Sequence, residues 1–479
     1  MNTLAVPFFA TDAVWNIMIQ LCIIAVGLLA GNIVRTKVPF MQKSLIPSAL
    51  IGGALILIFK AIYTDLCGWE NLIDKTSMEI ITYHALGLGF VALALKNNKV
   101  ESKSSTMKVI ETGTLTASTY IIQGIVGLLV TISMFYFGKK IFYAAGLLLP
   151  MGYGQGPGQA LNFGTIYMDR AAEQGIFFPG KDFGLSIAAM GFIVGCVVGV
   201  VYLNILKRKG KIKISEIQEK QRNKLSDYEG ENEIPDTESV DKFSIQICLV
   251  LFTYLLVYLV NHLLQTLDLG TFGEKTLMPL MWGFNFLLGT LFGIMMKGII
   301  KSLQKAKIMK REYINNYLLN RISGFFFDIM IVAGTAAINF SEFKGFALPY
   351  ILVCTLGAIA TFWFVLKACR HLYPNYTYEG FFSMFGMLTG TASNGMILLR
   401  EIDPKFETPA ANNLVLQSLP AVALGFPVLL LVSYAPQGFT QTLITLGILV
   451  VVFIIFNLFL FRKKIFKTRS HDTSSKTEP

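Results

Sequence analysis

Two glycine-punctuated stretches, GYGQGPGQALN at Gly152–Asn162 and GMLTGTASN at Gly386–Asn394, interrupt apolar sequence of membrane length. Both contain the pattern G-x-A-x-N, which ends at Asn162 in the first and at Asn394 in the second. Non-helical backbone cannot face lipid, because each unpaired N–H or C=O group costs several kcal/mol in hydrocarbon. Each stretch is therefore expected to lie inside the protein or to line a wet cavity. Two of them at matching positions of two halves are typical of a transport site.

The composition is that of a membrane protein. Of 479 residues, 53% are hydrophobic and 15% are charged, whereas roughly 25% are charged in a soluble domain. The net charge is +11, but the basic residues fall in alternate loops, which indicates membrane orientation and no nucleic-acid partner. The cysteines and histidines form no zinc motif, and there is no P-loop, H-E-x-x-H or nucleophile elbow. We therefore expect neither an enzyme nor a bound cofactor.

Apolar runs near the roughly 20 residues needed to cross a bilayer predict the number of spans. They lie at about 13–34, 44–63, 79–96, 113–137 and 183–206, then 243–264, 277–297, 322–340, 346–369 and 411–433, and last 441–461. The two glycine-rich stretches fall just before the fifth and tenth runs, within segments 141–169 and 379–400. The prediction is an all-α polytopic membrane protein of about eleven spans, in which each half has five spans plus one re-entrant segment and the last span is extra.

Charge decides the topology. If each glycine-rich segment enters and leaves by the same side, the second half is inverted relative to the first, and most of the 41 Lys and Arg residues fall on one side. The positive-inside rule assigns that side to the cytoplasm. Two full crossings would place the cluster Lys301–Arg321 outside, and we reject them. The sequence predicts a multi-pass protein of the cell membrane with an external N-terminus and a cytoplasmic C-terminus.

This topology predicts five regions along the chain. They are a first inverted repeat at 1–206, a charged cytoplasmic linker at 207–242, a second inverted repeat at 243–433, an extra span within 434–461 and a cytoplasmic tail at 462–479. The linker runs from basic to acidic with few apolar residues, so we assign it no chemistry. Inverted repeats of this kind let one site open alternately to either side of the membrane.

The re-entrant segments carry the candidate site. A break in a helix frees carbonyl groups for a cation and exposes the N-terminus of the next half-helix, whose dipole favours a carboxylate. Neutral oxygens suit a monovalent cation such as sodium better than calcium or a transition metal. The predicted substrate-binding residues are Gly154, Gln155, Gly156, Gly158, Gln159, Asn162, Thr391, Ser393 and Asn394; the predicted sodium ligands are Asn162, Thr389, Thr391, Asn394 and Asp328. Isolated glycines would indicate close helix packing instead, but two matched clusters favour a site.

Further polar residues lie within predicted spans. For His84 in the third span we expect a structural role. Asp328 in the eighth span is either an ion or proton ligand or a hydrogen-bonded carboxylate, and both interpretations stay open. A polar group after the second glycine-rich segment either faces the same cavity or bonds across helices. It consists of Asn412, Asn413, Gln417 and Ser418.

At these residues the chain resembles the bacterial sodium/glutamate symporter family. The resemblance rests on LIPSALIGG at 45–53, GLGFVALALKNNK at 87–99 and the two glycine-rich motifs in their order. It implies a homodimeric carrier, driven by sodium and taking up glutamate, in which a transport domain moves against a dimerising scaffold. The chain departs from the family where GYGQGP at 152–157 replaces Gly-Gly-His-Gly-Thr, and Asp328 and the extra span are also unusual. These departures leave the substrate open.

The sequence thus predicts a secondary active transporter that couples sodium to uptake of glutamate or a related amino acid or small carboxylate. One alternative is a passive channel, because two re-entrant half-helices from opposite faces also build pores. The other is a carrier of the same fold for a different substrate.

Overall fold

Ten helices among the described residues are long and apolar enough to cross a membrane, and Ser48–Tyr63 is a shorter apolar helix. The computed structural model describes residues 12–67, 72–96, 106–139, 141–212, 242–267, 270, 278–309, 313–339, 345–403 and 407–462. Within these ranges every regular element is a helix. The prediction of an all-α polytopic membrane protein is confirmed. Most of the predicted linker, 213–241, and most of the tail, 463–479, lie outside the described residues.

The chain folds into two compact units, and each unit draws on both halves of the sequence. Unit 1 comprises 1–79, 101–204 and 331–479, and unit 2 comprises 80–100 and 205–330. The boundaries therefore fall inside three helices, which are α4 (Lys75–Leu95), α8 (Gly180–Arg208) and α14 (Asn316–Ala336). The two inverted repeats expected from the sequence divide the chain by position instead, into a first and a second half. These repeats stay a prediction.

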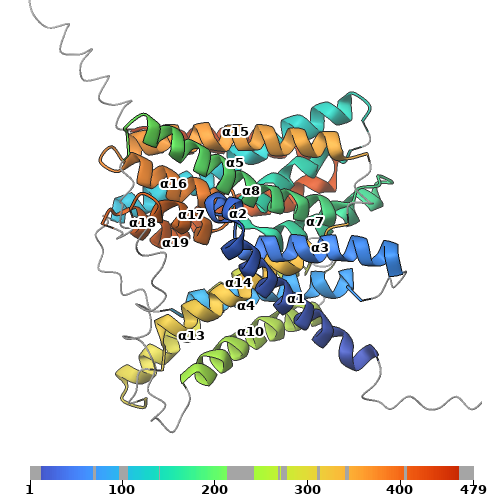
Figure 1. Ribbon diagram of the computed structural model, residues 1–479, viewed down its shortest axis with the longest axis vertical. Helices are drawn as coiled ribbons and strands as arrows, with labels where there is room; N and C mark the ends of the chain where they lie inside the picture. Colours follow the sequence, from blue (N-terminus) through green and yellow to red (C-terminus); the bar gives the residue numbers. More distant parts are fainter. Residues whose placement is uncertain are drawn as a thin grey trace, which may run out of the picture. The chain divides into compact units, whose positions relative to one another are not determined.

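Helix α5 (Thr106–Tyr136) is the centre of unit 1. It packs against α15 (Ala347–Leu372), as Figure 1 shows, and against α19 (Ser418–Tyr434) and α20 (Phe439–Leu460). Several buried hydroxyls of α5 donate to the carbonyl four residues earlier, as Thr119 does to Leu115 at 2.7 Å. A hydroxyl paired in this way can be buried without a partner from another helix.

A second packed pair in unit 1 is formed by α1 (Asp12–Lys37) and α3 (Ser48–Cys67), which are joined by α2 (Pro39–Ser44). Their backbones touch at Gly31, where a Cβ atom would lie 2.2 Å from the carbonyl oxygen of Ser48. The prediction of spans near 13–34 and 44–63 corresponds to these two helices.

Each predicted re-entrant segment folds as helices separated by a break. The first consists of η2 (Tyr143–Leu147), α6 (Leu148–Gln155) and α7 (Pro157–Glu173), and the second of α16 (Thr377–Leu388) and α17 (Ala392–Arg400). Helix α6 packs against α5, α15 and α16. The helix–break–helix pattern agrees with the predicted segments 141–169 and 379–400, and the membrane face from which each one enters stays a prediction.

Two predicted spans are interrupted. The run predicted at 411–433 is split at Gln417 into α18 (Ala410–Leu416) and α19. Pro420 has no N–H to donate to the carbonyl of Leu416, so a continuous helix would lack this hydrogen bond. The run predicted at 277–297 begins as the short α12 (Met278–Gly283), and its spanning helix is α13 (Asn285–Lys305).

Unit 2 contains α10 (Lys242–Thr266), α12, α13 and most of α4 and α14. Its core is an apolar cluster to which four of these helices contribute, with Val91, Val250, Met296 and Leu319 among its buried members. A large part of the α10 surface is exposed and apolar, as at Leu251, Leu255 and Leu259. Such a surface suits contact with lipid.

Candidate functional site

The first break lies at a single glycine. Gly156 has a φ of 83°, a left-handed conformation that favours glycine, and Pro157 begins α7 at a position where its missing N–H is not needed. Gly152 and Gly154 stay helical within α6. Their lack of a side chain serves packing, because a Cβ on Gly152 would lie 2.6 Å from Ile187 and one on Gly154 would lie 2.0 Å from the Tyr120 ring.

The second break spans Thr389, Gly390 and Thr391. Thr391 is extended, with φ −136° and ψ 167°, and is the residue that precedes α17. Neither Thr391 nor Gly156 caps its half-helix with a side chain. The first N–H groups of α7 and α17 are therefore not capped by these residues, and the positive ends of both helix dipoles face the breaks.

Helix α8 contacts both broken segments. A Cβ on Gly191 would lie 2.5 Å from the carbonyl oxygen of Thr389 and 3.3 Å from the Cα of Tyr153 in α6. One turn later, a Cβ on Gly195 would lie 2.5 Å from the hydroxyl oxygen of Thr389. Only glycine permits this approach, so a single face of α8 holds both broken segments side by side.

Helix α5 binds the last turns of both first half-helices. The Tyr120 hydroxyl donates to the carbonyl of Gly154 at 3.0 Å, and the Gln123 amide donates to the carbonyl of Leu388 at 2.9 Å. Tyr120 and Gln123 are three residues apart and so share one face of α5. The sequence reasoning missed both residues, although a glutamine in the middle of an apolar span was the available signal.

Several buried polar atoms around the breaks have no hydrogen-bond partner among the residues that the structure describes. They are both amide atoms of Gln159, Nδ2 of Asn394, Oε1 of Gln123 and Oγ of Ser118. Gln159 is 1% exposed, Asn394 2% and Gln123 0%. An unsatisfied buried polar group costs about 1–3 kcal/mol. Such a group calls for an explanation, and a bound ligand, ion or water is one.

Gln159 and Asn394 occupy the same place in their half-helices. Each is the third residue, because α7 begins at Pro157 and α17 at Ala392. The shared G-x-A-x-N pattern instead aligns Asn162 with Asn394. The register of that pattern is therefore not the register of the two breaks, and Gln159 is the structural counterpart of Asn394.

The structure places most of the predicted residues in the two broken segments. Those buried in the two broken segments are Gly154, Gly156, Gly158, Gln159, Asn162, Thr389 and Asn394. Gln155 and Thr391 are half-buried, and Ser393 is exposed. Thr389 already donates its hydroxyl proton to the Phe385 carbonyl at 2.7 Å. Asp328 lies on the part of α14 that belongs to unit 2, where its side chain is exposed.

Two of the remaining polar residues, Gln417 and Asn413, bond to other helices or their ends. Gln417 accepts a hydrogen bond of 2.8 Å from Thr116 in α5, and Asn413 donates to the Tyr376 hydroxyl at 3.0 Å. Of the two interpretations of this polar group, these contacts support hydrogen bonding between helices. In unit 2, the His84 ring nitrogen lies 3.0 Å from the Tyr254 hydroxyl, a contact that fits the structural role expected for His84.

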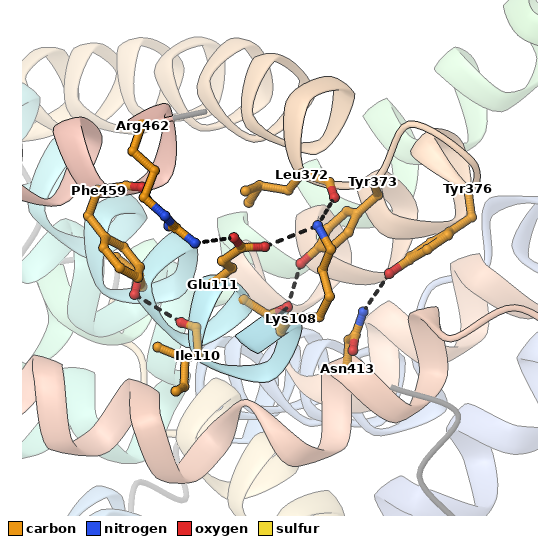
Figure 2. A network of polar contacts seen from close by, with 11 residues as sticks. Lys108, Ile110, Glu111, Leu372, Tyr373, Tyr376, Asn413, Phe459 and Arg462 are labelled. Atoms are coloured by element: carbon orange, nitrogen blue, oxygen red, sulfur yellow. Dashed lines mark hydrogen bonds and ion pairs between the residues drawn. The ribbon is translucent and has the colours of Figure 1, made fainter. Parts of the chain in front are cut away.

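A buried ion cluster ties α20 to the start of α5. Glu111 is 2% exposed, and its two carboxylate oxygens lie 3.0 Å from the Lys108 ammonium and 2.7 Å from the Arg462 guanidinium. Figure 2 shows Glu111 between these two cations. Lys108 also donates to the carbonyl of Leu372 at the end of α15. The end of α20, the helix of the predicted extra span, is thus joined to α5, which contacts both broken segments.

A sequence profile of the sodium/glutamate symporter family matches residues 14–379. The chain belongs to the sodium/glutamate symporter family. This membership agrees with the many apolar helices, makes the chain a multi-pass membrane transporter and points to sodium-coupled transport. The family match includes the first break and α8 but ends early in α16, so the second break and α18 to α20 lie beyond it. No individual curated protein matches the chain.

Proposed function

We propose that this member of the sodium/glutamate symporter family is a secondary active transporter that takes up glutamate or a related amino acid or small carboxylate by alternating access, driven by sodium. The observation that carries the proposal is the contact of both broken segments with Gly191. Near the start of α7 and of α17, buried side-chain amide atoms of Gln159 and Asn394 have no hydrogen-bond partner among the described residues. In an ordinary packed core these amides would have hydrogen-bond partners or would be replaced by apolar side chains. In a binding site they form their hydrogen bonds with the ligand.

Substrate binding uses the positive ends of α7 and α17. The side-chain amides of Gln159 and Asn394 donate to carboxylate oxygens, and the uncapped N–H groups of the same turns add to them. The half-buried Gln155 and Thr391 and the exposed Ser393 border these turns and serve the polar parts of the substrate. Gly156, Gly158 and the backbone of Gly154 allow close approach, and Asn162 supports the site one turn further along α7.

Sodium binding uses neutral oxygens. Hydroxyl, amide and main-chain oxygens are hard ligands, and they hold a monovalent cation weakly enough for release on the other side. Asn162, Thr389, Thr391 and Asn394 are the candidates from the two breaks, and Asp328 in unit 2 is a further candidate. The neutral oxygens left without a donor in the described residues, among them Oε1 of Gln159, fit this chemistry.

Transport requires that the site be exposed to each side in turn. The division of the chain into two compact units supports a mechanism in which unit 1, which contains both breaks, moves as one body. Inverted repeats supply two related conformations of such a carrier. We further propose a homodimer in the cell membrane, with the N-terminus outside and the C-terminus in the cytoplasm, on the basis of the family and the loop charges.

Thermal unfolding of the purified protein tests the binding part of this proposal. The melting temperature is measured in sodium chloride and in choline chloride, each with a panel of amino acids, dicarboxylates and monocarboxylates. The proposal predicts that one acidic or amino-acid compound raises the melting temperature by several degrees, and only when sodium is present. Stabilisation by no compound in either salt contradicts it. A non-saturating, sodium-independent flux in liposomes would favour the channel.

A further inference from the structure

The Oε1 atom of Gln123 is a buried acceptor that has no donor within the described part of the chain. The amide nitrogen of the same side chain donates to the Leu388 carbonyl at 2.9 Å and to the Thr361 hydroxyl oxygen at 3.0 Å. Because a main-chain carbonyl only accepts, the nitrogen must face Leu388, and this fixes the orientation of the amide. Gln123 is 0% exposed, so Oε1 lies in the interior, where no described donor contacts it.

The Gln123 amide nitrogen lies at the negative end of a half-helix. Leu388 is the last residue of α16, and its carbonyl belongs to the last turn, where the partial negative charge of the helix gathers. The Gln123 side chain is held to this turn through its nitrogen, and its amide group also carries a neutral oxygen, Oε1. Half-helix C-terminal ends and unwound carbonyls are the groups that coordinate sodium in carriers with broken helices.

The surroundings favour a monovalent cation over a proton or a divalent ion. No Asp, Glu, Lys, Arg or His occurs in the sequence ranges 112–138, 141–168 or 380–399, which form the central part of α5 and both breaks. A proton has no carboxylate or imidazole there to bind, and a divalent ion would find no charged ligand. The neutral oxygens match sodium.

We infer that Gln123 is a sodium ligand, with Oε1 coordinating the ion at the end of α16 together with carbonyl oxygens of that turn. This inference rests on the proposed sodium-coupled function and adds to it a ligand on α5, outside both broken segments. Sodium bound at Oε1 would also affect α15 and α16, because the nitrogen of the same side chain is hydrogen-bonded to Thr361 and Leu388. Sodium would thereby order the second break, at which the substrate binds.

The simplest competing role for Gln123 is that of a structural clamp through its nitrogen. A clamp and a sodium ligand differ in what the variant Gln123→Leu changes. Loss of a clamp lowers the melting temperature in choline and leaves unchanged the sodium concentration that gives half of the maximal stabilisation. Loss of a ligand raises that sodium concentration.

The experiment is a sodium titration of the melting temperature, in choline chloride of constant ionic strength, for the wild type, Gln123→Leu and the control Thr361→Val. Thr361→Val removes one partner of the nitrogen and leaves Oε1 intact. We expect the half-maximal sodium concentration to rise by roughly tenfold or more in Gln123→Leu, which corresponds to about 1.4 kcal/mol of binding free energy. In Thr361→Val it stays within about threefold of the wild type.

A second variant keeps the test decisive if Gln123→Leu does not fold. Gln123→Glu retains an oxygen at the ligand position, and we expect it to respond to sodium, whereas a clamp role predicts no change in sodium affinity for any folded variant. An unchanged half-maximal sodium concentration in Gln123→Leu, or a Gln123→Glu protein that is folded but unresponsive to sodium, overturns the inference. A wild type that does not respond to sodium overturns the proposed function itself.

Discussion

Gly191 lies so close to Thr389 that a Cβ atom on residue 191 would be 2.5 Å from the Thr389 carbonyl oxygen. The same Cβ would be 3.3 Å from the Cα of Tyr153, which belongs to the other broken segment. One residue of α8 is therefore in close contact with two broken segments that are more than two hundred positions apart in the chain. The central claim, that both breaks form one site, depends on this contact.

The first prediction concerns that contact. Gly191→Ala forces the two breaks apart, because neither a carbonyl oxygen nor a helix backbone can yield like a flexible side chain. Overpacking of this kind costs about 1–3 kcal/mol. We expect a lower melting temperature and at least a roughly tenfold loss of uptake, since displacements near 1 Å at a site are this costly. Wild-type transport in Gly191→Ala would show that the spacing is not critical.

The matched control is Gly447→Ala on α20, where a Cβ would meet nothing within 4 Å. Replacing an interior helical glycine by alanine in open space is neutral or stabilising by up to about 1 kcal/mol. We expect this variant to melt at or above the wild-type temperature and to transport normally.

The second prediction concerns the paired amides. Gln159→Leu removes two buried amide atoms, and Asn394→Leu removes one buried amide nitrogen, that have no hydrogen-bond partner among the described residues. We expect each variant to be more stable by about 1 kcal/mol and to lose stabilisation by substrate, which is the trade-off typical of functional sites. Thr165→Val on α7 is the control, because the Thr165 hydroxyl bonds only to the Leu161 carbonyl of its own helix in the contacts described. Substrate binding that survives in both leucine variants contradicts the proposed site.

The third prediction concerns the buried ion cluster of Figure 2. Glu111→Ala leaves the Lys108 and Arg462 cations next to each other without their carboxylate, and we expect a loss of about 3–5 kcal/mol of stability. Arg462→Ala costs less, because Lys108 still pairs with Glu111. The comparison is Glu173→Ala, which removes the exposed partner of Arg170 and should cost about 0–1 kcal/mol. Equal melting temperatures for Glu111→Ala and Glu173→Ala would refute the structural role of the cluster.

The fourth prediction concerns pH at the loop before α4. Burial alone would raise the pKa of the Asp74 carboxyl, but hydrogen bonds from Ser77, Thr76 and Asn16 outweigh it and hold the pKa below its ordinary value. A lowered pKa means that these contacts stabilise the fold at neutral pH, and that this stabilisation is lost as the pH falls below about 4. We expect Asp74→Asn to melt below the wild type at pH 7, and the difference to vanish on acidification. A difference that grows as the pH falls would reverse the assigned sign.

Much of the fold could be predicted from local sequence. Apolar length gave the helices, and the two glycine-rich stretches located the broken segments, because both signals act within a few residues. The position of the first break was harder. Four glycines were candidates, but only Gly156 has both a left-handed φ and a following proline, whereas Gly152 and Gly154 make room for Ile187 and Tyr120. Those neighbours come from other helices, which a local pattern does not contain.

The candidate site was predictable only in part for the same reason. The pattern G-x-A-x-N aligned Asn162 with Asn394, but the count from each helix start pairs Gln159 with Asn394. Gln123 was missed because its significance arises from contacts with Leu388 and Thr361, each more than two hundred residues away. The split of the tenth predicted span at Gln417 followed from Pro420, a signal that was present in the sequence but was outweighed by apolar length.

The measurement that tests the central claim most directly is uptake of radiolabelled glutamate into proteoliposomes, with and without an inward sodium gradient, competed by unlabelled amino acids and dicarboxylates. The account predicts saturable uptake that requires the gradient, and its loss in a protein carrying Gln159→Leu together with Asn394→Leu. If another compound competes better than glutamate, the carrier stands and the substrate changes. Flux that neither saturates nor depends on sodium, or full uptake by the double variant, would contradict the account.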